Sequence, residues 1–333
     1  MEDSFGHQIS YLRISVTDRC NERCAYCMPN ELQEWLPRGG VMSYEEILRV
    51  AGIAAGLGVT KIRVTGGEPL TRRDVIPFIK RLSNVSGIKD IGITTNGTLL
   101  SRPAENFKTM AAALVDAGVR TVNVSLDTLD ERKYAAITGR PYLNRVIEGI
   151  DELIDSGFEK VKINTVLMRG RNEDDLHELV NFSHQRNLLI RFIEMMPVSS
   201  KDVLKDSNFL PCGEVIKSLS NTFGRLEAKP DYKTNGPAAY YMIPGRSQLI
   251  GFIGAMTNLH FCESCNKLRL TCDGKLRPCL GSHLEFDLLY EIRSGASDER
   301  IADFISGVVA KKPKEHDFSS NYQPGRKMIA IGG

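Results

Sequence analysis

Six short apolar runs rich in β-branched residues are separated along the chain by five stretches with helical periodicity. The apolar runs span residues 11–17, 59–66, 88–97, 119–127, 161–168 and 189–196, at a spacing of about 30 residues. Near-continuous apolar strands separated by helices are typical of a parallel sheet that is covered on both faces and joined by right-handed crossovers. The sequence therefore predicts an α/β protein built on a six-stranded parallel sheet.

Helical periodicity is found between these runs, in the segments 43–58, 73–85, 103–118, 145–157 and 172–187. Ser43 stands where a helix N-cap is expected. Gly58, Gly118 and Gly157 stand where helices end, because glycine accepts the left-handed conformation of a C′ residue. These segments are expected to be the crossover helices.

Unusual residues follow nearly every apolar run. They are a cysteine-rich loop and the segments 66–69 (GGEP), 95–97 (TNG), 125–127 (SLD) and 195–196 (MM). A barrel gathers the ends of all its strands around one mouth, whereas an open doubly wound sheet brings only two together. We therefore expect an incomplete (β/α)6 TIM-type barrel over residues 1–198. The period is lost in residues 199–333, which are expected to form a C-terminal extension packed on the barrel, with short strands or a hairpin within 229–254.

The charge balance limits the partners of this chain. Its 43 basic and 41 acidic side chains give a net charge of +2, which excludes a protein whose main task is to neutralise a nucleic-acid backbone. The N-terminus has acidic residues and no apolar signal segment, and no run of about 18 apolar residues suited to a membrane span occurs. We expect a cytoplasmic protein that binds neither nucleic acid nor membrane.

Apart from Cys212, the cysteines fall into two groups, which in a reducing compartment indicates metal ligation rather than disulfides. The first group, Cys20, Cys24 and Cys27, follows the first strand. Three thiolates on one short loop can hold three irons of a cubane cluster and leave the fourth iron without a protein ligand. Structural zinc sites usually take four ligands from paired spacings. The spacing favours iron–sulfur, and a zinc site completed by Cys212 or a histidine remains the alternative.

The second group is Cys262, Cys265, Cys272 and Cys279. All four together would make a closed structural zinc site. Three of them, Cys262, Cys265 and Cys279, would again leave an open metal position. The spacing alone does not separate these two interpretations.

Cations within otherwise apolar stretches of the strands include Arg13, Arg63, Lys162 and Arg191. Burying an unpaired charge is costly, so each needs a reason. One is pairing with a buried carboxylate, for which Glu68, Asp127 and Glu194 are the candidates. The other is an anionic substrate in the barrel, since guanidinium groups suit bidentate phosphate contacts and lysine acts as a point charge.

The string CNERCAYC, in which Tyr26 precedes the third cysteine, resembles the signature of the radical S-adenosylmethionine enzymes, and Gly66-Gly67-Glu68-Pro69 resembles their GGEP motif. The resemblance implies that Cys20, Cys24 and Cys27 hold a 4Fe-4S cluster whose open iron binds S-adenosylmethionine. It assigns the contacts with S-adenosylmethionine to Tyr26, Gly67, Ser125 and Met196. Glycine there is expected because only a residue without Cβ lets the backbone approach a ligand closely.

The order of the motifs, Cys-x3-Cys-x2-Cys, GGEP, Cys-x2-Cys-x13-Cys and a final Gly-Gly, resembles the branch of this family that cyclises GTP in molybdenum cofactor biosynthesis, from about Arg13 to Gly333. The resemblance implies a second 4Fe-4S cluster on Cys262, Cys265 and Cys279, with Cys212 and Cys272 as spare thiols. The implied reaction converts GTP to (8S)-3′,8-cyclo-7,8-dihydroguanosine 5′-triphosphate. The adenosyl radical abstracts the 3′ hydrogen, C3′ attacks C8 of guanine, and reduction completes the step.

Further residues take their roles from the same resemblance. It assigns GTP binding to Arg13, Arg63, Thr94, Lys162, Lys267, Leu268 and Arg269, and catalysis to Arg269, Gly332 and Gly333. The family commonly has Arg-x-Arg where this chain has Lys267-Leu268-Arg269, which keeps the positive charge but loses one bidentate guanidinium. The run Lys311-Lys312-Pro313-Lys314 is expected to be a solvated loop.

The resemblance also implies an external electron donor, a homodimer, and delivery of the product to the cyclic pyranopterin monophosphate synthase. Two alternatives remain. One is a peptide-modifying radical S-adenosylmethionine enzyme with an auxiliary cluster, which would need more downstream cysteines. The other, from a different class, is a zinc-stabilised binding module, which would purify colourless with stoichiometric zinc.

Overall fold

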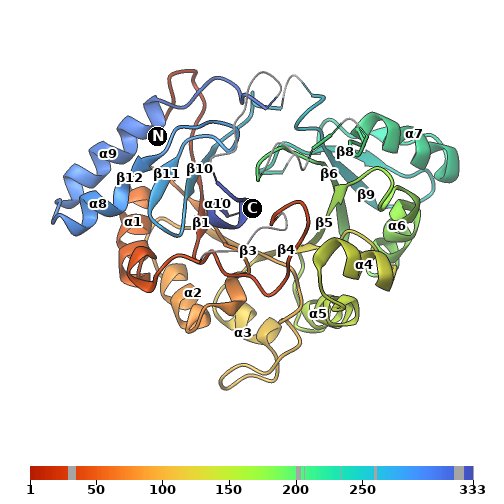
Figure 1. Cartoon of the computed structure of the whole chain (residues 1–333), viewed down its shortest axis with the longest axis horizontal. Helices are drawn as coiled ribbons and strands as arrows, with labels where there is room; N and C mark the ends of the chain where they lie inside the picture. The colour runs from red at the N-terminus through yellow and green to blue at the C-terminus, as the bar shows by residue number, and fades with distance from the viewer. Residues whose placement is uncertain are drawn as a thin grey trace.

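The six predicted strands are present and pair in sequence order. The computed structural model describes residues 1–28, 35–199, 204–205, 207–232, 234–258, 261–318 and 326–332. The strands are β1 (Tyr11–Ser15), β2 (Lys61–Thr65), β3 (Asp90–Thr95), β4 (Thr121–Ser125), β5 (Val161–Leu167) and β6 (Leu189–Glu194). Every neighbouring pair from β1 to β6 is parallel. The α/β class and the partial barrel are therefore confirmed (Figure 1).

The crossover helices cover the outer face of this sheet (Figure 1). They are α1 (Tyr44–Gly56), α2 (Val75–Ser83), α3 (Met110–Asp116), α4 (Glu131–Thr138), α5 (Leu143–Asp155) and α6 (Leu176–Gln185), with short 3-10 turns η1 (Arg38–Gly40), η2 (Pro69–Thr71) and η3 (Glu173–Asp175). Ser43 caps α1 in a capping box with Glu46, as predicted. Gly58, Gly118 and Gly157 all have positive φ, as predicted for helix ends.

Two helices differ from the expectation. The segment 103–118 becomes helical only after Thr109, whose side chain accepts the N–H of Ala112 and so starts α3 there. α4 lies between β4 and α5, where no separate helix was expected; Asp130 caps its start and Gly139, with φ 68°, ends it. The crossover from β4 to β5 thus contains two helices.

The C-terminal extension lengthens the sheet at both ends and does not merely pack on it. β10 (Lys267–Leu270) runs parallel to β1, and antiparallel β11 (Lys275–Arg277) and β12 (Phe286–Asp287) follow it outward. At the other end, β9 (Leu249–Ile253) runs parallel to β6 and forms the predicted hairpin with β8 (Ala239–Met242), beyond which lies β7 (Glu227–Ala228). The described residues therefore form one open sheet of twelve strands.

Four helices complete the extension: α7 (Cys212–Phe223), α8 (Leu288–Arg293), α9 (Asp298–Ala310) and α10 (Met328–Ile331). The first three lie outside the arc of strands, whereas α10 lies inside it (Figure 1). No helix in the described part of the chain is long and apolar enough to cross a membrane.

Strand residues alternate between the hydrophobic core and the interior of the arc. Leu12, Ile14, Ile62 and Val64 are buried in the core, whereas the residues between them point to the other face because side chains alternate along a strand. The interior face is therefore lined by the polar and charged members of the apolar runs.

Candidate active site

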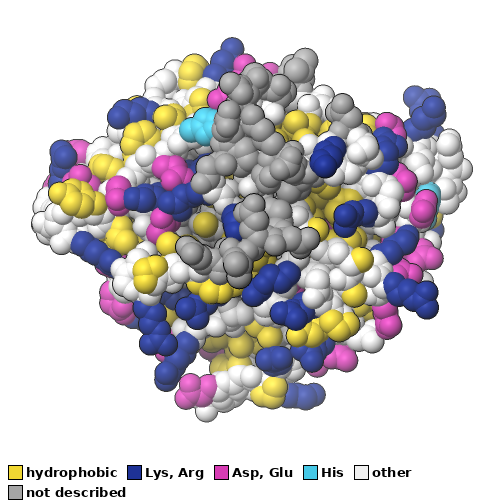
Figure 2. All heavy atoms as spheres, viewed as in Figure 1, with side chains coloured by type: hydrophobic (Ala, Val, Ile, Leu, Met, Phe, Trp, Pro, Cys, Tyr) yellow, Lys and Arg dark blue, Asp and Glu magenta, His cyan; other side chains and the backbone are white. Residues whose placement is uncertain are grey.

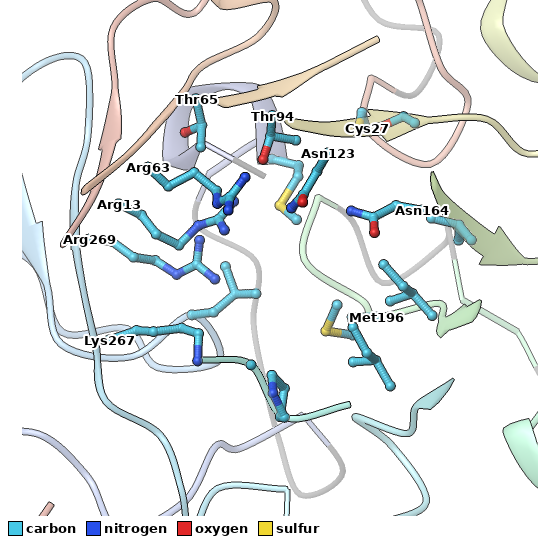
Figure 3. Close-up of a pocket in the computed structure, with 18 of the residues that line it drawn as sticks. Arg13, Cys27, Arg63, Thr65, Thr94, Asn123, Asn164, Met196, Lys267 and Arg269 are labelled. Carbon is cyan, nitrogen blue, oxygen red and sulfur yellow. The ribbon is translucent and has the colours of Figure 1, made fainter. Parts of the chain in front are cut away.

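A cavity of about 360 Å³ lies inside the arc of strands. Both cysteine groups and the strand cations line it. Of the predicted site residues, its walls include Arg13, Cys20, Cys24, Tyr26, Cys27, Arg63, Gly67, Thr94, Ser125, Lys162, Met196, Cys262, Cys265, Lys267, Arg269 and Cys279. Figure 3 shows Arg13, Arg63, Arg269 and Lys267 along one wall, facing Asn164 and Met196 across the cavity. The fold brings together residues that are up to about 260 positions apart in the sequence, as the pairing of Tyr11 with Lys267 requires.

The first cysteine loop is held by the end of α4. The backbone N–H groups of Arg23 and Ala25 donate to the carbonyl oxygens of Thr138 (2.7 Å) and Ile137 (2.9 Å). Within the loop, the N–H of Cys27 donates to the carbonyl of Cys24 at 2.9 Å, which makes the turn that places both thiols on the cavity. α4, which the sequence pattern missed, therefore positions this loop.

Carboxylates surround the first cysteine loop. Burial raises the pKa of Cys20 to about 12, and Glu68 adds to the rise. Burial also raises the pKa of Glu22 and Glu68 to about 7 and that of Asp127 to about 6. These raised pKa values show that the surroundings of the first cysteine loop disfavour negative charge on its thiols and carboxyl groups. Because a metal ligand must be a thiolate, loading this loop with metal releases protons.

Gly66 and Gly67 pair with the cysteine loop. The N–H of Gly67 donates to Thr17 O at 2.7 Å, and the N–H of Glu68 donates to Arg19 O at 2.8 Å. A Cβ on Gly66 would lie 2.7 Å from Thr17 O. The observed reason for glycine here is thus close approach to the protein backbone, rather than to a ligand alone as expected.

Glu68 joins the ends of two strands. Its carboxylate accepts the N–H of Leu70 (3.0 Å), the N–H of Asn96 (2.7 Å) and the hydroxyl of Thr95 (2.9 Å). Asn96 in turn points its side-chain amide at Cys20 Sγ, 3.9 Å away. The GGEP and TNG segments are therefore joined to each other through Glu68, and both contact the first cysteine loop or the residues just before it.

The second cysteine group has three members on the cavity. Cys262, Cys265 and Cys279 line it, and the N–H of Cys265 donates to Cys262 O at 3.0 Å. Cys272 is fully buried and does not line the cavity. Burial raises the pKa of its thiol, and the negative charges of Asp18 and Asp273 add to the rise. The four-thiolate zinc site that the spacing allowed is therefore wrong. Cys212 is also buried away from the cavity, next to Glu194.

The donor sets suit clusters better than single ions. Across the described residues, no three His, Cys, Asp or Glu side chains converge closely enough to hold one metal ion. A cubane cluster takes its thiolates on different irons and so needs them farther apart. Two groups of three unpaired thiols on one cavity fit that requirement.

Cations surround the second cysteine group. Burial raises the pKa of Cys265, but the ammonium groups of Lys312 and Lys267 outweigh it and bring this pKa below its ordinary value. Burial raises the pKa of Cys262 and Cys279, and Lys312 opposes the rise at both. The two cysteine groups thus lie in surroundings of opposite charge.

Three arginines are neighbours across the sheet. The strand register places Arg269 of β10 beside Arg13 of β1, and Arg13 beside Arg63 of β2. Gly92 is next in this row, and a Cβ there would lie 2.8 Å from the guanidinium carbon of Arg63. Within the described residues, the hydrogen bonds that Arg63 donates go to neutral groups: the Tyr11 hydroxyl (2.6 Å), Ile93 O (2.8 Å) and the Thr121 hydroxyl (3.0 Å).

The proposed carboxylate partners of these cations are occupied elsewhere. Asp127 accepts the Tyr26 hydroxyl and the N–H of Val166, both at 2.8 Å. Glu194 accepts the N–H groups of Cys212 (2.9 Å) and Met256 (2.8 Å). Among the described residues, no ion pair joins Arg63, Lys162 or Arg191 to a carboxylate, so the explanation by buried pairing is wrong for these three.

The cations that line the cavity, here called the cation wall, suit the binding of an anion; they are Arg13, Arg63, Lys162, Arg191, Lys267 and Arg269. Burial, together with Arg191 and Arg63, lowers the pKa of Lys162 to about 7. Burial lowers the pKa of Arg269 to about 9, and Arg13 adds to this. Burial lowers the pKa of Arg191 to about 10. A polyanion bound in the cavity would raise these three pKa values again, because a nearby negative charge favours the protonated, positively charged form of each side chain.

The C-terminal tail enters the cavity region. Arg269 donates from Nη1 to Gly332 O at 3.1 Å, and Gly332 has φ 83°. The tail is anchored by Arg326, which binds both carboxylate oxygens of Asp273 (2.8 and 2.6 Å) and one of Glu285 (2.9 Å). Gly333, the other predicted tail residue, lies outside the described residues.

The tail also contacts the first cysteine loop. The N–H of Met328 donates to the Ser199 hydroxyl at 3.0 Å, and that hydroxyl donates to Cys27 O at 3.0 Å. The tail therefore links the first cysteine loop to Arg269, which lies near the second group.

Leu268 differs from the other predicted site residues. Its side chain is buried in the core, on the face of β10 opposite to Lys267 and Arg269, and Leu268 does not line the cavity. Arg191, one of the strand cations considered for an anionic substrate, lines the cavity. Residues that the sequence analysis did not assign to the site also line it: Asn96, Asn123, Asn164 and Lys312. Asn123 and Asn164 had a detectable signal, since each is a polar residue inside an apolar strand. Arg191 donates to Asn164 Oδ1 at 3.0 and 2.6 Å.

Comparison with known families agrees with this site. Residues 14–183 match the model of the Radical SAM superfamily, and residues 188–318 match that of Molybdenum Cofactor Synthesis C. The chain is therefore a radical S-adenosylmethionine protein with a molybdenum cofactor synthesis domain.

Similarity over the whole length narrows this class. The chain is 46% identical to GTP 3′,8-cyclase of Thermodesulfovibrio yellowstonii and 44% identical to that of Pelotomaculum thermopropionicum, in both cases over all of each chain. It belongs to the GTP 3′,8-cyclase family. Among solved structures, it is similar to Streptococcus suis SuiB bound to S-adenosylmethionine, with a TM-score of 0.64 at 15% identity, over 98% of this chain and 78% of that one. That likeness concerns the fold.

Proposed function

We propose that this protein is a radical S-adenosylmethionine GTP 3′,8-cyclase, a lyase that converts GTP to (8S)-3′,8-cyclo-7,8-dihydroguanosine 5′-triphosphate in the first step of molybdenum cofactor biosynthesis. The observation that carries the proposal is one cationic cavity with a three-cysteine group at each of two places on its wall. Full-length identity above 40% to two GTP 3′,8-cyclases supports it.

Cys20, Cys24 and Cys27 would hold one 4Fe-4S cluster, and Cys262, Cys265 and Cys279 the other. When bound, the first cluster and S-adenosylmethionine supply the radical that removes a hydrogen atom from the ribose. Tyr26, Gly67, Ser125 and Met196 line the cavity and are proposed to hold S-adenosylmethionine. The hydrogen bond from the Tyr26 hydroxyl to Asp127 fixes the Tyr26 ring.

The cation wall would bind the triphosphate. Arg13, Arg63 and Arg269 form an adjacent row, and Lys162 and Lys267 extend its charge along the cavity. Thr94, which lines the cavity, and Leu268, which does not, complete the GTP contacts that the family resemblance assigns. In this arrangement the guanine lies toward the second cysteine group, and the ribose lies between the two groups.

Gly332 and Gly333 would close the cavity over GTP. The carbonyl of Gly332 already accepts from Arg269. Any residue larger than glycine at 332 would meet Ser15, whose Cβ would lie 2.9 Å from the added Cβ. The tail thus orients Arg269 and keeps water from the reacting ribose.

We further propose that the protein acts as a cytoplasmic homodimer, receives electrons from an external donor, and passes its product to the cyclic pyranopterin monophosphate synthase. Sedimentation of the anaerobic holoenzyme tests the dimer. An activity that depends on an added reductant tests the donor, and conversion of the product by the purified synthase tests the transfer.

The central test is an anaerobic assay of the reconstituted protein with dithionite, S-adenosylmethionine and each nucleoside triphosphate in turn. We expect 5′-deoxyadenosine to form with GTP and to carry deuterium from 3′-deuterated GTP. If 5′-deoxyadenosine forms but no nucleotide raises its yield, the GTP assignment is wrong and peptide substrates come next. If none forms despite an intact first cluster, the proposed function is wrong.

A further inference from the structure

Lys312 follows α9, in the lysine run that was expected to be a solvated loop. That expectation is wrong for this residue: Lys312 is only 5% exposed, whereas Lys311 and Lys314 on either side are exposed. A buried ammonium without an opposite charge is costly. In the part of the chain that the structure describes, no ion pair connects Lys312 to a carboxylate, so its position needs another explanation.

The ammonium of Lys312 is directed at the second cysteine group. It donates to Pro278 O at 2.6 Å, to Lys267 O at 3.3 Å and to Cys265 Sγ at 3.5 Å. Pro278 directly precedes Cys279, and Lys267 begins β10 two residues after Cys265. Lys312 therefore joins the two parts of the chain that carry these cysteines. Of its three acceptors, only the sulfur can carry a full negative charge.

The first cysteine group also has a cation nearby, but it is bound differently: Arg23 donates to the backbone carbonyl of Cys20 at 2.7 Å, and among the described residues no ammonium or guanidinium group donates to a sulfur of this group. The side-chain donor that faces Cys20 there is the neutral amide of Asn96, at 3.9 Å. A fixed positive charge near an iron–sulfur cluster favours the reduced form, which is the more negative one. The same charge also favours the thiolate form of the ligands.

We propose that Lys312 is a positioning residue that holds the second cysteine segment together and, through its fixed charge, raises the reduction potential of the cluster bound by Cys262, Cys265 and Cys279. The inference rests on the proposed function, because it takes that cluster as present.

The test is a redox titration of the anaerobic holoenzyme, followed by electron paramagnetic resonance. We expect two one-electron steps. Lys312→Met should lower the ratio of reduced to oxidised form of one cluster about tenfold at a fixed potential, which is a shift of about 59 mV. Lys312→Arg should restore the step, and Lys314→Met, an exposed neighbour, should leave both steps unchanged. Asn96→Ala should move only the other step, which identifies the first cluster.

Iron is counted before the titration. If the wild-type protein binds only about four irons per chain, the second cluster and with it the proposed function are wrong. If Lys312→Met loses the second cluster, the titration uses Lys312→Gln, which removes the charge and keeps a donor. A lower potential in that variant supports the proposal. Wild-type potentials in Lys312→Met or Lys312→Gln with about eight irons per chain would overturn it.

Discussion

The two cysteine groups face one cavity, yet their surroundings have opposite charge. Near the first group lie Glu22, Glu68 and Asp127, all buried. Near the second lie Lys267 and Lys312, with Arg269 beyond them. Carboxylates raise thiol pKa values and lower cluster potentials, and cations do the reverse. With the functions proposed above, these two surroundings prepare similar ligand sets for different work: a strong reductant at the first group, and an electron-accepting, anion-binding site at the second.

Removing a ligand from each group gives the largest expected effects. Cys24→Ala and Cys265→Ala should each lose about four irons per chain. Cys24→Ala should stop the cleavage of S-adenosylmethionine, whereas Cys265→Ala should retain slow cleavage that GTP no longer stimulates. Iron analysis and 5′-deoxyadenosine yield measure both. Loss of cleavage in Cys265→Ala with the first cluster intact would contradict this division of roles.

The cation wall should serve GTP and not S-adenosylmethionine. Arg63→Met removes a buried guanidinium from the row, and a charge-assisted hydrogen bond contributes roughly 1.5–3 kcal/mol. We expect GTP affinity to fall about 10- to 100-fold, with S-adenosylmethionine affinity unchanged, in calorimetric titrations under anaerobic conditions. The exposed Arg73→Met is the matched control. An equal loss for both ligands would mean that the wall supports the whole cavity.

GTP binding should weaken as pH rises through neutrality. The pKa of Lys162 in the ligand-free protein is about 7, because burial and neighbouring cations disfavour its charge. Below pH 7 the Lys162 amine is already protonated in the free protein. Above pH 7 it is neutral and must take up a proton when GTP binds. The affinity for GTP therefore falls with increasing pH, by at most about tenfold per pH unit. Lys162→Arg should remove this slope. A Lys162→Arg profile as steep as that of the wild-type protein would contradict the assignment.

Loosening the tail should have the smallest effect. Arg326→Ala removes the contacts with Asp273 and Glu285 that hold the tail between the two groups. We expect the ratio of cyclised product to 5′-deoxyadenosine to fall about threefold, since partly exposed ion pairs contribute roughly 0.2–1 kcal/mol. Arg300→Ala, an exposed ion pair elsewhere, is the control. An unchanged ratio would mean that the tail docks without Arg326.

The sequence predicted the strands well because buried parallel strands leave a continuous apolar pattern. It could not predict how the extension joins the sheet, since β10 is four residues long and pairs with a strand at the opposite end of the chain. Lys312 was misassigned for a similar reason, because only folding brings Pro278 and Cys265 to it. Grouping along the chain located the cysteines of both groups, but the choice of Cys262, Cys265 and Cys279 without Cys272 came from the family resemblance. Gly92 acts through a contact with Arg63 that no local pattern reveals. The boundary at residue 198 stays a prediction.

The pairing of β1 with β10 has a consequence for how the chain is made. Tyr11 pairs with Lys267, so 256 further residues must be synthesised before the β10 partner of β1 is available. At about 5–20 residues per second, that is roughly 13–50 s of synthesis with an open strand edge. Unpaired edges invite association with other chains. The nascent protein should therefore need protection on the ribosome, most of all on the side where its second cysteine group will later arrive.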